Sequence, residues 1–327
     1  MIDMPTGWMP FPELTDDQKQ LHQSLVAGMP KFSSFGDKPP VGTKVLLSDS
    51  WRHQKVVDAL GFVFPGWYQF TGSCVNVGGL TAAQTLNFWE PLFKDDPDKI
   101  VVLWGWYNYG MSRKRAGMNG RGEGSFGSTY AESLKVDGIV DARLDELEGE
   151  VANIIQASGM IAISKSDELK WSDGNTASAK LRELAKPHPI YSAPASSGAA
   201  VRDGILSGYT FTRAGMKYVN PGTAKVVGGA LVGSYNGRGG HQESWLGYWN
   251  HPELGELIWE QNQWGANAYG SDPGGGPAGG CWVRMSEVDQ FCRDQYAEVY
   301  CLSQYEGYPD RREEVLDWSN GNNPFLS

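Results

Sequence analysis

The chain has 327 residues, a formal net charge of −10 and a pI of about 5.0, which disfavours binding to nucleic-acid phosphates because such binding needs clustered lysine and arginine. The one basic cluster, at 113–115, is interpreted as a solvated turn. Four cysteines are too few for a disulfide scaffold, and no segment resembles a signal peptide or approaches the ~18 apolar residues of a membrane span. We therefore expect a soluble protein, cytoplasmic or virion-associated, without nucleic-acid or membrane partners.

The first part of the chain is expected to be mainly helical. Residues 1–45, rich in proline and glycine, are expected to wrap the surface as an arm. A long helix is expected over 74–94, with an imperfect apolar face and a break near Pro91. The other elements expected in this part are helices at 55–62, 129–140, 141–159 and 178–185, an extended run at 100–110 and a glycine-rich loop at 117–128.

The pattern changes near residue 200 to short β-branched and aromatic runs between glycines. The expected strands are at 208–215, 223–235, 243–249, 256–264 and 279–285, followed by a helix at 286–302. The sequence thus predicts an α+β protein with an arm at 1–45, a mainly helical lobe at 46–195, a mainly β lobe at 196–327, and a cleft between the lobes.

Cys74 is expected at the first position of the long helix, behind the small residues Gly72 and Ser73. Unpaired N–H groups and the dipole at a helix N-terminus stabilise a thiolate, which is the reactive form of cysteine. Cys74 is therefore a candidate nucleophile. The alternative is a small thiol packed in the core, and the residues around Cys74 alone favour that alternative.

A cysteine nucleophile needs a base, and among five histidines His241 stands out because it opens an expected strand behind glycines. The next expected strand ends in Asn262, beside Trp264. An amide there can accept the N–H of the base and fix its tautomer, while the indole shields that bond from water. Taken singly, His241 and Asn262 also fit ordinary turn residues.

Three segments together resemble the papain-like cysteine peptidases, of a divergent phage and bacterial type. They are "GSC" entering a helix at 72–74, "HQESWLGY" at 241–248 and "NQWG" at 262–265, in the family's order of cysteine, histidine and asparagine. The resemblance implies a papain-like two-lobe fold, with the nucleophile helix in a helical left lobe and a β-barrel-like right lobe. It also implies a peptide or protein substrate and no cofactor.

The resemblance also implies roles for individual residues. Cys74 would attack a peptide carbonyl, His241 would act as base and acid, Asn262 would orient it, and Gln69 would help to bind the oxyanion. Gln69 lies one residue closer to the cysteine than in the family, with Tyr68 in the expected place, so a one-residue bulge is needed to bring its amide to the oxyanion. Substrate contacts are implied for Gly72, Ser73, Gly124, Ser125, Phe126 and Trp264.

Three functions are compatible with these residues. The first is an active thiol peptidase, and the second is a papain fold kept as a structural or binding module, for example a virion component that contacts other virion proteins. The third is a related thiol chemistry, such as amide hydrolysis or acyl transfer. No inhibitory pro-segment is recognisable, because residues 1–45 are short and broken by proline for that role.

No metal site is expected. Cys281, Cys292 and Cys301 lack the spacing of zinc ligands, and no histidine is near them. Cys292 and Cys301 are expected on one helix, too far apart to form a disulfide. The sequence otherwise leaves the disulfide state of these three cysteines open.

Overall fold

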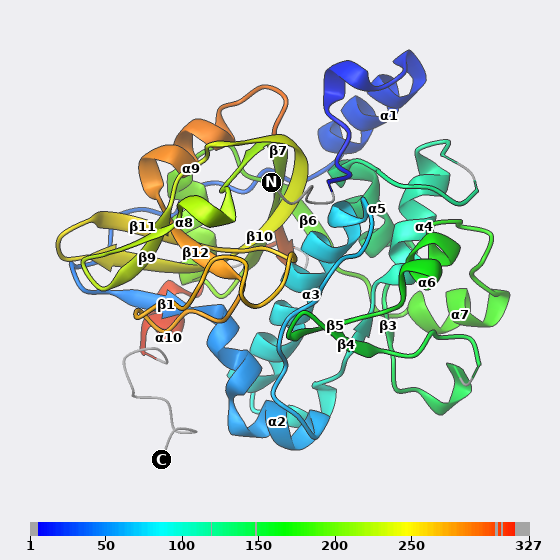
Figure 1. Cartoon of the computed structure of the whole chain (residues 1–327), viewed down its shortest axis with the longest axis horizontal. Helices are drawn as coiled ribbons and strands as arrows, with labels where there is room; N and C mark the ends of the chain where they lie inside the picture. The colour runs from blue at the N-terminus through cyan, green and yellow to red at the C-terminus, as the bar shows by residue number, and fades with distance from the viewer. Residues whose placement is uncertain (1–5, 119, 148, 305–306, 309, 318–327) are drawn as a thin grey trace.

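The computed structural model describes residues 6–118, 120–147, 149–304, 307–308 and 310–317. Most helices gather on one side of the molecule, and a large sheet lies on the other side (Figure 1). This arrangement confirms the predicted α+β class. Among the described residues, no helix has the length and apolar character needed to cross a membrane.

A long helix, α3, runs through the centre of the molecule, and every residue from Cys74 to Leu92 is buried. It packs against strands as well as helices, and Gly78 permits one close approach because a Cβ there would lie 2.8 Å from the carbonyl oxygen of Gln242. The helix continues through Pro91 and ends two residues later. The helices are α1 (Asp16–Ala27), α2 (Gln54–Leu60), α3 (Cys74–Phe93), α4 (Trp106–Arg115), α5 (Gly127–Val136), α6 (Lys165–Trp171), α7 (Ala179–Ala185), α8 (Gly198–Leu206), α9 (Met285–Cys292) and α10 (Arg312–Asp317).

Nine strands form the large sheet, in the order β6-β13-β7-β10-β11-β12-β9-β8, with β1 paired to β10 outside this path. The end strands β6 and β8 do not pair with each other within the described residues, so the sheet is open and is not the closed barrel that "barrel-like" would suggest. The strands are β1 (Lys44–Leu46), β2 (Leu103–Trp104), β3 (Val140–Asp141), β4 (Ile155–Ala157), β5 (Met160–Ala162), β6 (Tyr191–Pro194), β7 (Thr210–Tyr218), β8 (Lys225–Val227), β9 (Ala230–Gly233), β10 (Gly237–His251), β11 (Gly255–Gln261), β12 (Gly280–Arg284) and β13 (Glu298–Ser303).

Strand β10 connects the sheet to the helical side. The side chains of Gln242 and Ser244 reach α3, where Gln242 Nε2 donates to the carbonyl oxygen of Val75 over 3.2 Å and Ser244 Oγ donates to that of Gly78 over 2.6 Å. Because successive side chains of a strand alternate between its two faces, His241 and Glu243 share the other face of β10.

Three expected elements are wrong in part. Only Leu103–Trp104 of the extended run at 100–110 is strand, and α4 begins directly after it. The helix expected at 141–159 is instead a set of short pieces that ends in the hairpin β4–β5. The helix expected at 286–302 stops at Cys292, and β13 replaces its second half. All four cysteines are free thiols.

The N-terminal region does more than wrap the surface. Its helix α1 has no buried residue and begins with a capping box formed by Thr15 and Gln18. Figure 1 shows α1 beside α5 at the edge of the molecule. By contrast, Trp8, Leu14 and Phe32 are buried in the core.

Candidate active site

Cys74 occupies the first position of α3 and has no exposed surface. Burial raises the pKa of its thiol to about 12, although backbone N–H groups of Gln242, Gly7 and Trp8 form hydrogen bonds to it that act in the opposite direction. The sulfur therefore lies between strand β10 and the N-terminal segment of the chain. In this conformation it is a neutral, capped thiol.

His241 and Asn262 are in contact, as the sequence predicts. His241 Nε2 lies 3.1 Å from Asn262 Oδ1, and the ring of Trp264 stacks on the imidazole with centroids 4.2 Å apart. Tyr218 meets the imidazole edge-on at 5.8 Å. Burial lowers the pKa of His241 to about 3, and the hydrogen bond to Asn262 opposes this effect. The ring is therefore neutral, and its single N–H is at Nε2, which donates a hydrogen bond to Asn262 Oδ1.

The other ring nitrogen of His241, Nδ1, has no hydrogen-bond partner among the described residues. Its neighbour on β10, Gln242, donates its backbone N–H to the Cys74 sulfur. The thiol and the imidazole thus lie on adjoining elements. Because Asn262 engages Nε2, Nδ1 is the ring nitrogen that is left without a partner.

The loop that precedes Cys74 is held by the buried carboxylate of Glu168 on α6. Glu168 accepts hydrogen bonds from the backbone N–H groups of Phe70 and Thr71, both at 2.8 Å, and from the hydroxyls of Thr71 at 2.6 Å and Ser73 at 3.2 Å. Burial raises the pKa of Glu168 to about 7. No sequence motif indicates a role for Glu168, because it lies far along the chain from Cys74 on a short helix.

Gln69 lies at the start of the same loop and is buried. Its Nε2 donates to the carbonyl oxygen of Thr71 over 3.0 Å, and its backbone N–H donates to that of Gln263 over 3.1 Å. The amide thus binds within its own loop in this conformation. Its use for an oxyanion remains a prediction.

Residues 6–9, which we call the inner arm, lie across the cysteine. The N–H groups of Gly7 and Trp8 both donate to the carbonyl oxygen of Gly240 at 3.1 Å. On the other side, Ser125 N–H donates to Gly7 over 3.0 Å and Met9 N–H donates to Ser125 over 2.9 Å, which makes a parallel bridge between Trp8 and Ser125. Part of the arm expected at 1–45 to wrap the surface therefore covers the cysteine, although the sequence shows no recognisable pro-segment.

Glycines make this close approach possible. A Cβ on Gly7 would lie 1.7 Å from the carbonyl oxygen of Gly72, and one on Gly240 would lie 2.0 Å from that of Trp8. A Cβ on Gly72 would in turn lie 2.5 Å from the carbonyl oxygen of Thr6. Backbone therefore packs directly on backbone at these positions, and no other residue type fits without displacing the inner arm.

The side chain of Trp8 anchors the inner arm to β13. Its Nε1 donates to Glu298 over 2.5 Å, and the same carboxylate accepts from the backbone N–H groups of Gly127 at 2.7 Å and Ser128 at 2.8 Å at the start of α5. Tyr300 OH at 3.0 Å and the His22 ring at 3.2 Å complete the set. Burial acts to raise the pKa of Glu298, but these hydrogen bonds and His22 outweigh it and hold that pKa below its usual value.

The remaining predicted substrate residues surround the inner arm. Gly124 has a φ of +80°, and its N–H donates to the carbonyl oxygen of Gly72 over 3.0 Å. Phe126 is buried beside His22, with the ring centroids 6.3 Å apart. Arg113, expected in a solvated turn, is instead buried and donates to the carbonyl oxygens of Glu123 and Gly124, which fixes this loop.

No group of three or more histidine, cysteine or acidic side chains that could hold a metal ion occurs in the part of the chain that the structure describes. The arrangement instead joins a thiol at a helix N-terminus, an imidazole oriented by an amide, and a groove that already holds an extended peptide segment. These groups are those of nucleophilic thiol chemistry.

Comparison with known proteins gives the fold. No protein-family model and no curated protein matches the sequence. Similar solved structures include xylellain, a cysteine protease from Xylella fastidiosa, with a TM-score of 0.51, 15% identity and 92% of each chain covered. Procathepsin B S9 from Trypanosoma congolense has a TM-score of 0.51 at 9% identity, covering 90% of this chain and 85% of that one.

Digestive procathepsin L 3 from the larval midgut of Tenebrio molitor has a TM-score of 0.50 at 11% identity, covering 87% of this chain and 78% of that chain. At such low identities the likeness establishes the fold alone, which is papain-like.

Proposed function

We propose that this chain is a papain-like thiol peptidase that its own inner arm keeps latent. The observation that carries the proposal is the extended segment at residues 6–9, which is bound across Cys74 through backbone hydrogen bonds to Ser125 and Gly240. A groove that pairs with the backbone on both sides of a thiol is suited to peptides of varied sequence. The substrate class is therefore peptide or protein.

The reaction begins once the inner arm leaves the groove and water replaces it. The burial that raises the pKa of Cys74 and lowers that of His241 is then relieved. Cys74 passes its proton to Nδ1 of His241, and the thiolate at the N-terminus of α3 attacks the peptide carbonyl. The imidazolium then protonates the leaving amine, while Asn262 Oδ1 accepts a hydrogen bond from Nε2–H and keeps the ring oriented.

The acyl-enzyme that results is hydrolysed by water, with His241 as the base that takes the water proton. The backbone N–H of Cys74 and the amide of Gln69 are the donors proposed for the oxyanion. Gln69 must turn away from Thr71 to reach it. Losing such a donor costs roughly 10²–10³ in rate, so this movement decides how fast the enzyme works.

A second candidate function is a papain fold retained as a binding or structural module, in a virion or elsewhere. The observation that favours it is the capped, fully buried thiol, whose pKa is raised to about 12. The divergent phage or bacterial origin implied by the sequence motifs belongs with this candidate. Displacing the inner arm separates the two functions.

Gly7→Val in the full chain provides this test, because its side chain would collide with the backbone of Gly72. We expect a thiol-reactive peptidyl epoxide to label Cys74 at least about tenfold faster in Gly7→Val than in the wild type. Gly28→Val is the matched control, since its Cβ would meet no atom closer than 3.5 Å. Peptide mapping by mass spectrometry locates the label.

A second substitution in the Gly7→Val chain tests whether His241 is the base. Labelling should fall strongly when His241→Ala is added to Gly7→Val, and a fluorogenic peptide should be cleaved only while both Cys74 and His241 are present. A folded Gly7→Val protein that labels no faster than the wild type and cleaves no peptide would overturn the peptidase and leave the module.

A further inference from the structure

A buried charge cluster lies on the face of β10 that carries His241. It consists of Arg213 on β7, Glu243 on β10 and Glu260 on β11, and none of the three is more than 1% exposed. Arg213 donates to the Glu243 carboxylate, and its Nε lies 3.1 Å from Glu260 Oε2. Direct register between Arg213 and Glu243 on neighbouring strands brings these side chains together.

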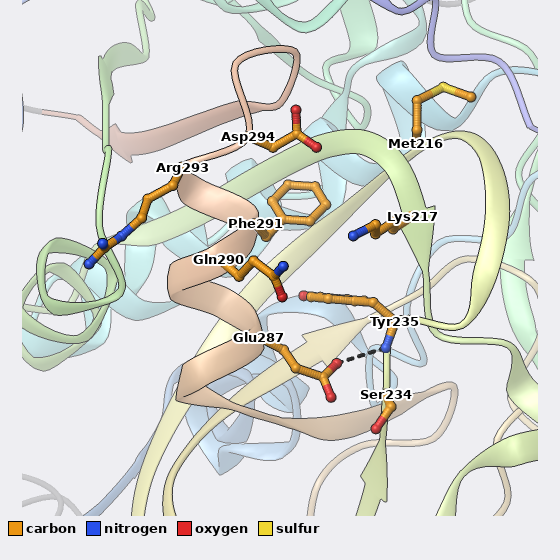
Figure 2. Close-up of a pocket in the computed structure, with 9 residues that line it drawn as sticks. All are labelled: Met216, Lys217, Ser234, Tyr235, Glu287, Gln290, Phe291, Arg293 and Asp294. Carbon is orange, nitrogen blue, oxygen red and sulfur yellow. Dashed lines mark hydrogen bonds between the residues drawn. The ribbon is translucent and has the colours of Figure 1, made fainter.

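Aromatic rings close this cluster off from solvent. Tyr235 and Phe291 lie over the Arg213 guanidinium, each ring centroid 4.8 Å from it. The same two residues line a cavity of about 500 Å³, with Lys217 and Glu287 also on its wall (Figure 2). Because the rings separate the cluster from that cavity, its charges act on their neighbours with little screening by water.

The two glutamates of the cluster have different surroundings. Glu260 accepts from Tyr235 OH at 2.6 Å and from Trp245 Nε1 at 2.9 Å, in addition to Arg213. Oε1 of each glutamate has no hydrogen-bond partner in the described part of the chain, but Oε1 of Glu260 lies 2.7 Å from an Arg213 nitrogen, whereas Oε1 of Glu243 lies 4.0 Å from His241 Nε2. An under-satisfied carboxylate oxygen thus lies beside the proposed base.

The charges of the cluster do not balance by themselves. It holds one guanidinium and two carboxylates, so it lacks one positive charge when both glutamates are ionised. A proton on Glu243 supplies that charge in the closed chain, where burial and the neighbouring Glu260 raise the pKa of Glu243 against the effect of Arg213. An imidazolium at His241 would supply it equally well.

We propose that Glu243 is a positioning residue for His241, whose ionised carboxylate stabilises the imidazolium formed when Cys74 gives up its proton. The inference rests on the proposed function. When the inner arm leaves, water enters from the His241 side, which the rings of Tyr235 and Phe291 do not cover, and takes the proton of Glu243; the proton of Cys74 then moves to Nδ1 of His241. Glu243 and Asn262 face the opposite nitrogen, so the cation is held on the side away from the sulfur.

Several other groups act on the same imidazole and enter any pH profile. They are Arg213 and Tyr218 from β7, and Asn262 and Trp264 from the segment after β11. Tyr269 and Glu260 act through these groups, because Asn262 donates to Tyr269 OH and Arg213 donates to Glu260. Arg213 opposes a charge on His241. Without Glu243, that opposition would act on the imidazolium with less compensation.

The test compares Glu243→Gln with Glu260→Gln, each in the full chain carrying Gly7→Val. Both remove one carboxylate from the cluster, but only the first removes the one beside His241. NMR titration of the His241 ring should place its deprotonation about one pH unit or more lower in Glu243→Gln than in the parent. Glu260→Gln should shift it less than half as far, and Glu243→Asp should recover most of the loss.

A second measurement does not depend on displacing the inner arm. In the closed wild-type chain at pH 8, infrared difference spectra against Glu243→Gln should show a protonated carboxyl band. The inference fails if this band is missing, or if the two glutamine variants shift the His241 titration equally. Neither readout uses a peptide substrate, so absent peptide cleavage would count against the proposed function and not against Glu243.

Discussion

Two buried carboxylates flank the occupied cleft, and their surroundings have opposite effects on their charge. Glu298 accepts hydrogen bonds from the Trp8 indole, two backbone N–H groups and a tyrosine hydroxyl, and it lies beside the His22 ring. These contacts lower its pKa. Glu243 shares Arg213 with Glu260, and its pKa is raised. Burial is complete or nearly so at both sites, so the difference comes from the donors and the neighbouring charges, which are His22 beside Glu298 and Glu260 beside Glu243.

This difference separates two tasks. A carboxylate saturated with donors resists protonation and fixes the inner arm, whereas one with an unused oxygen can exchange a proton with its surroundings. Substitution of Glu298 should therefore free the inner arm. Substitution of Glu243 should leave the inner arm in place and act on the charge of His241.

Glu298→Gln should have the largest effect. The glutamine amide turns N–H donors toward the N–H donors of Trp8 or of the start of α5, which costs several kcal/mol at a buried charged site. We expect epoxide labelling of Cys74 in the full chain to accelerate about a hundredfold, equivalent to ~2.7 kcal/mol. Glu13 is an exposed carboxylate shortly after the inner arm, and Glu13→Gln should label at the same rate as the wild type.

The acid dependence of labelling checks the same contact. Because the folded-state pKa of Glu298 lies below its unfolded value, its contribution is present above the ordinary glutamate pKa and is lost as the pH falls through the folded value. Wild-type labelling should therefore rise on acidification. An equal rise in Glu298→Gln would show that another group controls the inner arm.

Glu168→Gln should have an intermediate effect, on stability. Its folded-state pKa of about 7 exceeds the model-peptide value, so its contribution is complete below about pH 4.5 and is lost as the pH rises through 7. The free energy of unfolding of the wild type should therefore fall by about 2–3 kcal/mol from this group between pH 5 and pH 8. Urea unfolding should show this slope in the exposed control Glu183→Gln and not in Glu168→Gln.

Trp8→Phe should have the smallest effect. It replaces the buried indole with a smaller aromatic ring and removes the N–H that donates to Glu298. A hydrogen bond to a charged group contributes about 1.5–3 kcal/mol. The remaining apolar contacts of residue 8 still hold the inner arm, so labelling of Cys74 should accelerate only roughly tenfold. Labelling as fast as in Glu298→Gln would mean that the indole N–H alone carries the anchor.

Local patterns in the sequence predicted much of the fold and the residues around the thiol. The helix at Cys74, the strand at His241 and the amide at Asn262 are each visible in a few neighbouring residues. The hairpin at 155–162 was also visible in principle, because Ser158 and Gly159 adopt φ values of 48° and 80° and Ser-Gly is a turn signal. The acidic, helix-like composition of 141–159 hid it.

The remaining features depend on contacts that sequence spacing does not encode. Trp8 meets Glu298 across 290 positions, and Thr71 meets Glu168 across 97. Gly7 looks like an ordinary flexible residue until Gly72 is placed against it. Predicting an occupied groove required knowing which distant backbone passes the thiol, and only the folded chain supplies that.

The inner arm belongs to the molecule that it blocks, so dilution cannot remove it. A tethered occupant of this kind acts at an effective concentration of the order of millimolar, and a free peptide must compete with it. The apparent affinity for substrate then falls by the fraction of molecules that are open at any moment. A substitution that loosens Gly7 or Trp8 would therefore lower KM by changing a population, while the turnover of each open molecule stays the same.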